Sequence, residues 1–176
     1  MTLYDDIYEI ASDNYGLITS EQAREISVSD KEMSRLTKDG RLRRLGRGVY
    51  RIKHYAPSQN DPYAEAVALV GSGSYLYGES VIAMHELAPS NPARIFVATP
   101  NRVRKKLPSS IRVLFQKGQE EVVEYEGIPS QTITSAILSC RETVMSDRLI
   151  SAARNARNNG LITRTEEHDL LKELDD

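Results

Sequence analysis

The sequence has few of the residues that build metal, redox and membrane sites. Its 176 residues include one cysteine, three histidines, two phenylalanines and no tryptophan. The lone Cys140 excludes an internal disulfide and a cysteine-based zinc cluster, and its apolar surroundings predict a buried thiol. No apolar run approaches the roughly 18 residues that span a membrane. The acidic start MTLYDDIYEI differs from a signal or transit peptide. We therefore expect a cytoplasmic protein without a metal, a cofactor or a membrane partner.

The basic residues are clustered in two segments, although the net charge of the chain is small. The formal net charge is −2 at pH 7, yet residues 31–53 contain nine Lys or Arg against two acids. A second segment, residues 94–117, has seven Lys or Arg and no acid. Two such patches in a slightly acidic chain favour a polyanionic partner. The alternative is a pair of solvated loops, and it carries more weight for the second patch.

Helical spacing and capping signals organise the first 40 residues. Apolar residues recur over 2–13 as on an amphipathic helix, which ends at Gly16. Two capping boxes then predict a short helix over 20–25 and another from residue 30 to a stop at Gly40. The predicted boxes are Thr19 with Gln22 and Ser29 with Glu32.

The helix after Ser29 has two different faces. Met33 and Leu36 share an apolar face that we expect to be buried. Residues at i, i+3, i+4 and i+7 share the opposite face, and these are Lys31, Ser34, Arg35 and Lys38. A stripe of three cations and a hydroxyl suits a helix in the DNA major groove. An ordinary exposed helix is the alternative, because such stripes are common on surfaces.

The next stretch, RLRRLGRGVYRI, predicts a two-stranded hairpin. Apolar residues alternate with arginines around a GRG turn, so one face is apolar. The cations on the other face, at the tip or just before the hairpin are Arg41, Arg43, Arg44, Arg47 and Arg51. A helix, a short helix, a basic helix and a basic hairpin follow one another in a winged helix-turn-helix, whose wing contacts the DNA backbone or minor groove.

Residues 14–53 resemble the winged helix of AbiEi-type antitoxins from bacterial type IV toxin–antitoxin and abortive-infection (phage defence) systems. The match lies in GLIT, in the VS cap and in DGRLRRLGRGVYR. The resemblance implies a repressor that binds double-stranded DNA at inverted repeats in its own promoter, as a dimer. It also implies neutralisation of a nucleotidyltransferase-like toxin, functionally if not by direct contact.

The remainder predicts a second domain. HYAPSQNDP is typical of a linker, which divides the chain into a DNA-binding domain (1–56) and an α/β antitoxin domain (57–176). A helix capped by Asp61, a helix over 79–87, three strand segments and helices over 133–142, 146–159 and 164–174 follow. The expected fold class is α+β, with a winged helix-turn-helix before a mixed α/β domain that has a small sheet and C-terminal helices.

Catalytic motifs are weak in this second half. GSGSYLYGES lacks the strand and the Lys-Ser/Thr pair of a phosphate loop, so we expect a plain turn. Glu79, His85 and Glu86 could suggest acid–base chemistry, but Glu79 and His85 do not share a helix face well. We therefore expect no catalytic residues and no enzyme, with a nucleic-acid-processing enzyme as a remote alternative.

The family resemblance extends loosely into this half, through YGESVIAMHEL and EGIPSQTITSAIL. In the family this domain has a positive surface that is needed against the toxin. The residues implied for that surface are Arg102, Arg104, Lys105 and Lys106. A regulator with a ligand-sensing or partner-sensing second domain and no toxin remains an alternative. GLIT recurs at Gly160, but an acidic helix follows it, so shared turn chemistry explains the repeat better than a second DNA-binding module.

Overall fold

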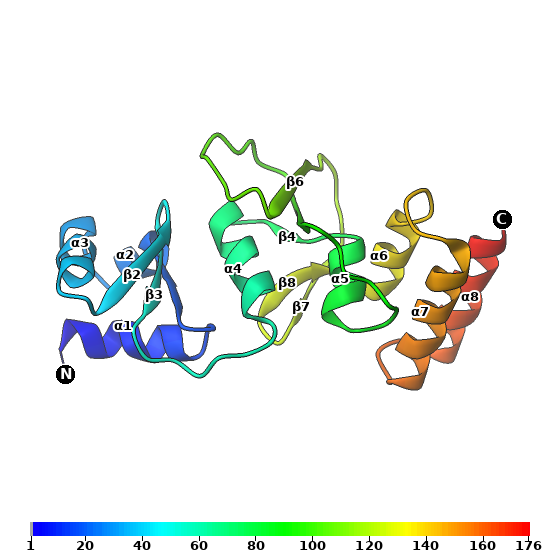
Figure 1. Cartoon of the computed structure of the whole chain (residues 1–176), viewed down its shortest axis with the longest axis horizontal. Helices are drawn as coiled ribbons and strands as arrows, with labels where there is room; N and C mark the ends of the chain where they lie inside the picture. Colours follow the sequence, from blue (N-terminus) through cyan, green and yellow to red (C-terminus); the bar gives the residue numbers. More distant parts are fainter. Residues whose placement is uncertain (1) are drawn as a thin grey trace. The chain divides into compact units, whose positions relative to one another are not determined.

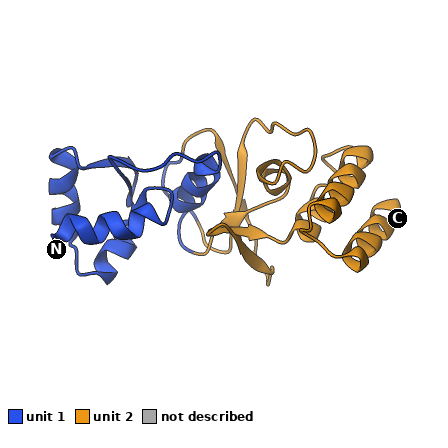
Figure 2. Cartoon of the chain, turned by 90° about the horizontal axis from the view of Figure 1, so that it is seen from below, with its two compact units in different colours: residues 1–72, 103–107 blue, residues 73–102, 108–176 orange. Residues whose placement is uncertain are grey.

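The computed structural model of the chain describes residues 2–176, which form two compact units (Figure 2). The first unit runs to Ser72 and also contains the distant segment Val103–Leu107. The second unit consists of Gly73–Arg102 and Pro108–Asp176. The expected boundary at residue 56 therefore leaves out one helix and one piece of the second basic segment that pack with the winged unit.

The first unit has the order of a winged helix-turn-helix, followed by one more helix (Figure 1). Its elements are α1 (Leu3–Ser12), β1 (Leu17–Thr19), α2 (Ser20–Glu25), α3 (Asp30–Lys38), β2 (Leu42–Gly46), β3 (Val49–Ile52) and α4 (Asp61–Val70). The predicted fold class is confirmed, and in this unit the predicted helix limits agree with the structure to within one or two residues. In the second unit, the helices predicted over 79–87 and 133–142 each end three residues earlier, at Met84 and Ser139.

Capping boxes begin the helices α1, α2 and α3. In each box the cap hydroxyl accepts a hydrogen bond from the backbone N–H three residues on. The side chain of that third residue accepts one from the N–H of the cap. The boxes at Thr19 and Ser29 are therefore confirmed, and a third box, at Thr2, begins α1 without having been predicted. The predicted cap of α4 was wrong, because Asn60 precedes that helix and Asp61 accepts from the Ser58 N–H instead.

A Schellman turn fixes the angle between α2 and α3. The Val28 N–H donates to the Ala23 carbonyl at 2.8 Å, and the Ser27 N–H donates to the Arg24 carbonyl at 2.9 Å. Ser27 adopts a φ of 63°, the left-handed conformation that this turn requires. Val28 is buried with Met33 in the core of the unit, which also contains Ile7 and Ile52. The basic face of α3 consequently points away from that core.

The wing is the outer part of a three-stranded sheet with the order β1-β3-β2. Both pairings are antiparallel, with Ile18 opposite Tyr50 and Leu42 opposite Ile52. The hairpin prediction is confirmed for β2 and β3, but it was incomplete because β1 pairs with the far side of β3. As the central strand, β3 has all four of its residues buried.

Helix α4 packs on this sheet through one ion pair and one close backbone approach. The Arg51 side chain donates from Nη1 to Glu65 Oε2 at 2.9 Å, and Arg51 is only 7% exposed. The Arg51 guanidinium also lies 4.9 Å from the Tyr55 ring centroid. A Cβ atom at Gly46 would lie 2.5 Å from Leu69 Cδ2, so the turn of the wing rests directly on α4.

The second unit combines a five-stranded mixed sheet with four helices (Figure 1). Its elements are β4 (Tyr75–Leu76), α5 (Glu79–Met84), β5 (Ile95–Thr99), β6 (Ile111–Phe115), β7 (Val122–Tyr125), β8 (Ile128–Gln131), α6 (Ile133–Ser139), α7 (Ser146–Asn158) and α8 (Arg164–Asp175). The strand order is β6-β5-β4-β8-β7. The plain turn predicted for GSGSYLYGES was therefore wrong, since β4 lies within it at the centre of the sheet.

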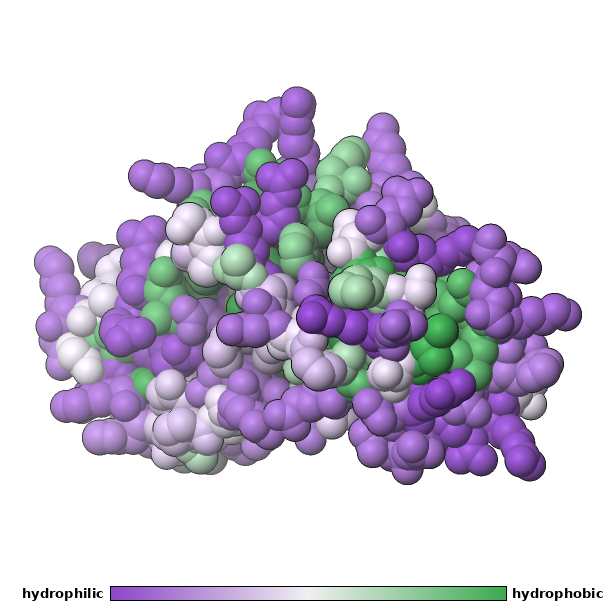
Figure 3. All heavy atoms as spheres, turned by 45° about the vertical axis from the view of Figure 1, so that its right-hand side comes forward, coloured by the Kyte–Doolittle hydropathy of each residue, from purple (hydrophilic) through white to green (hydrophobic). Residues whose placement is uncertain are grey.

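Side-chain packing and one polar hub hold the second unit together. Leu87, Ile137, Leu149 and Ala156 belong to a buried cluster that joins α5 to the C-terminal helices. Gln131, only 2% exposed, accepts from the Gly78 N–H at 2.7 Å and donates to Glu120 and Ser139. A buried amide with its hydrogen bonds satisfied stabilises one arrangement of its neighbours. On the face drawn in Figure 3, hydrophilic side chains cover most of the surface, and apolar ones lie between them in small areas.

We predict that Glu65→Ala destabilises the first unit by about 1.5–3 kcal/mol, because it leaves the Arg51 guanidinium buried without its charged partner. Urea unfolding followed by circular dichroism measures the effect. The exposed Glu9→Ala on α1 is the matched control, with an expected change within about 0.5 kcal/mol. Equal destabilisation by the two variants would contradict the role assigned to this ion pair.

Candidate nucleic-acid interface

The basic stripe of α3 lies on its exposed face. Met33 and Leu36 are buried, as predicted. The four residues predicted to contact DNA from this helix are all exposed, namely Lys31, Ser34, Arg35 and Lys38. The Ser29 capping box and the Gly40 turn fix the two ends of the helix. The stripe is therefore presented to solvent from a short helix of defined orientation.

The cations of this stripe carry uncompensated charge. Within residues 2–176, none of Lys31, Arg35 and Lys38 forms an ion pair. The nearest surface pair joins Arg24 of α2 to Asp30 at the start of α3, with 3.5 Å between Nη2 and Oδ1. Both of these side chains are more than half exposed, so the pair contributes little to stability. Unpaired cations on one helix face attract an anion.

The wing adds a second group of cations. Arg43, Arg44 and Arg47 are exposed, and Arg47 occupies the turn between β2 and β3. The Arg44 Nε donates to the Gly46 carbonyl at 3.3 Å, which holds this side chain along the wing. Arg41 is exposed at the start of the hairpin, and its guanidinium lies 5.2 Å from the Tyr4 ring centroid.

Arg51 differs from the other predicted DNA contacts. The structure buries its side chain against α4, where Glu65 neutralises the guanidinium. Arg43 lies in the edge strand β2, and its side chain is exposed to solvent. Arg51 lies in the central strand β3, where alternation of side chains along the strand does not lead to exposure. We accordingly correct the predicted contact set by leaving Arg51 out, since its charge is already compensated inside the protein.

The four residues of the predicted antitoxin surface are divided between the two compact units. Arg102 belongs to the second unit, whereas Arg104, Lys105 and Lys106 belong to the segment that packs with the first. Arg104 and Lys106 are exposed, but Lys105 is half-buried. Burial lowers the pKa of Lys105, and the nearby positive charge of Arg47 lowers it further. Nothing in the local pattern of residues 102–106 predicts this inward orientation.

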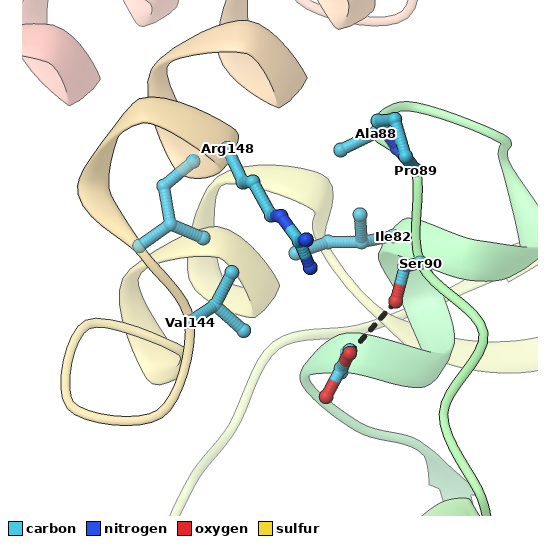
Figure 4. Close-up of a pocket in the computed structure, with 8 residues that line it drawn as sticks. Ile82, Ala88, Pro89, Ser90, Val144 and Arg148 are labelled. Atoms are coloured by element: carbon cyan, nitrogen blue, oxygen red, sulfur yellow. Dashed lines mark hydrogen bonds between the residues drawn. The ribbon is translucent and has the colours of Figure 1, made fainter.

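The candidate catalytic residues of the second unit do not converge. Glu79 accepts a hydrogen bond from Ser90 Oγ at 2.8 Å, and the exposed Glu86 follows the end of α5. Among residues 2–176, no three His, Cys, Asp or Glu side chains are grouped as a metal site would require. A pocket beside Glu79 is lined by Ile82, Ser90 and Arg148 (Figure 4). Its free space is about 10 Å³, close to what one water molecule needs.

His85 and Cys140 both have environments that favour their neutral forms. The His85 ring lies 4.0 Å from the Tyr125 ring, centroid to centroid, and its Nδ1 is buried without a hydrogen-bond partner in the described part of the chain. Burial lowers the pKa of His85, although the charge of Glu126 acts in the opposite direction. Burial, helped by Glu79, raises the pKa of the Cys140 thiol to about 11. A protonated thiol is a poor nucleophile and a poor metal ligand.

The structure contains no helix, within residues 2–176, that is long and apolar enough to cross a membrane.

The comparison with protein families supports the interpretation of the first unit. Residues 5–53 match the sequence model of a family described as "Transcriptional regulator, AbiEi antitoxin", which confirms the resemblance predicted from the sequence over that range. The chain is also similar to the crystal structure of the RV2827C protein from Mycobacterium tuberculosis, with 15% identity and a TM-score of 0.47. That similarity covers 98% of this chain and 82% of the other. No curated protein matches the chain.

We predict that the second unit loses stability as the pH falls below about 6.5, the usual pKa of histidine. Because burial lowers the pKa of His85 in the folded state, the unfolded chain binds the proton more readily, and acid favours unfolding. Above about pH 6.5 both states are neutral at His85 and this contribution vanishes. His85→Gln should reduce the acid-induced loss in chemical unfolding at several pH values, whereas His168→Gln on the exposed face of α8 should not. An unchanged pH dependence in the His85 variant would refute this assignment.

Proposed function

We propose that the protein is a DNA-binding antitoxin, which represses its own toxin–antitoxin operon and neutralises a nucleotidyltransferase-like toxin. The proposal is supported chiefly by the unpaired cationic stripe of α3 beside an arginine-rich wing. This surface lies within the region that matches the regulator family.

The proposed mode of DNA binding follows from the shape and charge of the first unit. Helix α3 enters the major groove with its exposed stripe, where the Arg35 guanidinium can pair with a guanine edge. Ser34 and Lys31 lie within one turn of Arg35 and can contact a base edge or a phosphate. Arg43, Arg44 and Arg47 of the wing bind the backbone or the minor groove. Binding as a dimer places two α3 helices in successive major grooves of an inverted repeat.

Toxin neutralisation is the part of the proposal that concerns the second unit. The ligand-sensing alternative requires a cavity of about 300–1,000 Å³ for a small molecule. The pocket beside Glu79 has room for about one water molecule, so it does not serve that purpose. The family that residues 5–53 match is described as an antitoxin, and this description favours a partner protein over a small ligand.

We predict different consequences for the helix and the wing. Arg35→Ala should cost about 1–3 kcal/mol of binding free energy and change the preferred sequence, because it removes contacts with a base. Arg47→Ala should weaken binding to all sequences similarly and reduce the salt dependence, because it removes contacts with phosphates. Gel shifts with the promoter and with an unrelated duplex, at several salt concentrations, measure both effects. If the double variant still binds the promoter at moderate salt, the surface is wrongly assigned.

We also predict that the chain rescues growth when it is co-expressed with the toxin encoded next to its own gene. The double variant Arg35→Ala and Arg47→Ala separates the two activities, since it should lose promoter repression. If neutralisation does not depend on DNA binding, this variant still rescues growth. A neighbouring gene without a nucleotidyltransferase sequence would favour the regulator alternative. Loss of rescue in His85→Gln, with the fold intact, would favour the enzyme alternative.

A further inference from the structure

The five-stranded sheet of the second unit has two open edges, formed by β6 and β7. Within residues 2–176, each of these strands pairs with one neighbour only, β6 with β5 and β7 with β8. The outer side of an edge strand has N–H and C=O groups with no partner in the sheet, and another extended chain can pair with them. Both strands therefore have one side on which a further strand can add.

On β6, the outward main-chain groups are those of Val113 and Phe115. At the two ends of this strand, the Ser110 carbonyl accepts a hydrogen bond from β5 at 2.7 Å, and the Gln116 N–H donates one to β5 at 3.0 Å. The backbone groups of alternate residues point to the same side of a strand. The even-numbered residues of β6 therefore face β5, and the odd-numbered residues face away from the sheet.

On β7, the outward main-chain groups are those of Val122 and Glu124. The strand ends in a two-residue turn, so Tyr125 is the hydrogen-bonded partner of Ile128 across it. Glu124, one residue earlier, lies opposite Pro129, which has no N–H to donate. Hydrogen-bonded and non-hydrogen-bonded pairs alternate along an antiparallel ladder. Val122 and Glu124 therefore direct their N–H and C=O groups away from β8.

The two edges carry opposite charge. Residues 111–117 contain two cations and no acid, whereas residues 120–126 contain four acids and no cation. Four of these charged side chains are exposed and form no ion pair in the described part of the chain, namely Arg112, Lys117, Glu121 and Glu124. Pairing of either edge with its own copy brings like charges together, which destabilises a strand pair. Pairing of β6 with β7 of a second copy brings opposite charges together.

Both edges also expose apolar side chains. Among the described strands, the exposed large hydrophobic residues are Phe115 (54%), Val122 (45%) and Val123 (38%), and all of them lie on β6 or β7. An edge that carries charge of one sign beside exposed apolar side chains fits an extended segment of the opposite sign. Each edge of this sheet has the properties that the other requires.

We propose that β6 of one copy adds antiparallel to β7 of a second copy, so that the sheet continues from one chain into the next. The register that matches the outward groups gives four facing pairs: Phe115 with Val122, Val113 with Glu124, Leu114 with Val123 and Lys117 with Glu120. Aromatic and β-branched residues stabilise a strand pair when they face one another, and so do opposite charges. The pairing covers all three exposed apolar side chains.

The contact is head-to-tail, since it joins different surfaces of two identical chains. It uses residues of the second unit alone, and it differs from the two-fold contact that an inverted repeat requires. A stable interface buries about 1,200–2,000 Å² in total, and one pair of short strands is a small contact by that measure. We therefore expect reversible association that depends on protein concentration.

Cysteines introduced at a facing apolar pair test the register in the full chain. One variant carries Leu114→Cys and the other carries Val123→Cys. These residues form a non-hydrogen-bonded pair in the proposed ladder, with Cα atoms about 4.5 Å apart, which lies within the range of about 4.4–6.8 Å that a disulfide spans. The native thiol of Cys140 is buried and does not compete. Diamide oxidation and non-reducing electrophoresis measure the cross-link.

We expect a mixture of the two variants to give a cross-linked dimer and either variant alone to give none. In a head-to-tail row, equivalent residues of neighbouring copies lie roughly 20 Å or more apart, the width of the sheet. A mixture of Arg112→Cys with Val123→Cys is the control, because Arg112 is more exposed than Leu114 but lies two residues out of register. This control should give little cross-link.

Charge reversal tests the same contact without cysteines. Sedimentation velocity at rising protein concentration should show association of the wild type, and Lys117→Glu should weaken it about two- to tenfold. Lys172→Glu, on the exposed face of α8, makes the same change of charge away from the edges and should associate as the wild type does. Circular dichroism verifies that the variants remain folded.

Four results would overturn strand addition between copies. If Leu114→Cys alone cross-links as well as the mixture, β6 pairs with itself about a two-fold axis instead. If the Arg112 control cross-links equally, the disulfides result from random collisions. If the wild type stays monomeric and no mixture cross-links, the edges do not pair between copies. If it stays monomeric and Lys117→Glu loses rescue from the toxin, this edge serves the toxin instead. The cross-linking and sedimentation measurements contain no DNA, so they are independent of the proposed DNA binding.

Discussion

The ion pair between Arg51 and Glu65 is the contact on which the arrangement of the winged unit depends. It joins the central strand β3 to α4 and neutralises a guanidinium that is otherwise surrounded by protein. With α4 in place, the turn of the wing rests on Leu69, and the last turn of the helix receives Lys105. The ion pair therefore joins β3, the wing and α4, and it determines that Arg51 is buried while the other arginines of the wing remain at the surface.

Folding divides the cations of this chain into two groups. Arg51 and Lys105 are drawn inward, one by a carboxylate and the other by a helix terminus. The cations of the α3 stripe and the other arginines of the wing stay exposed, and none of them forms an ion pair within residues 2–176. A formal net charge of −2 conceals this division. Local charge without a counter-ion, more than total charge, is what a polyanion recognises.

The second unit is organised around a polar residue that has no sequence motif. Gln131 connects the start of α5, the chain before β7 and helix α6 through hydrogen bonds of its amide group. Glu79 and His85, the residues that suggested chemistry, are instead a hydrogen-bonded carboxylate and a desolvated imidazole. Their surroundings are those of a packed scaffold.

The sequence by itself determined the features that depend on neighbours within about four residues. The capping boxes, the buried face of α3, the exposed stripe of Lys31, Ser34, Arg35 and Lys38, and the hairpin all follow from local spacing and cap chemistry. Only the tertiary structure decided that β4 is a central strand, that Arg51 is buried and that Lys105 reaches α4. These outcomes depend on which element, distant in the sequence, packs against a residue. The periodicity within a segment does not show which element that is.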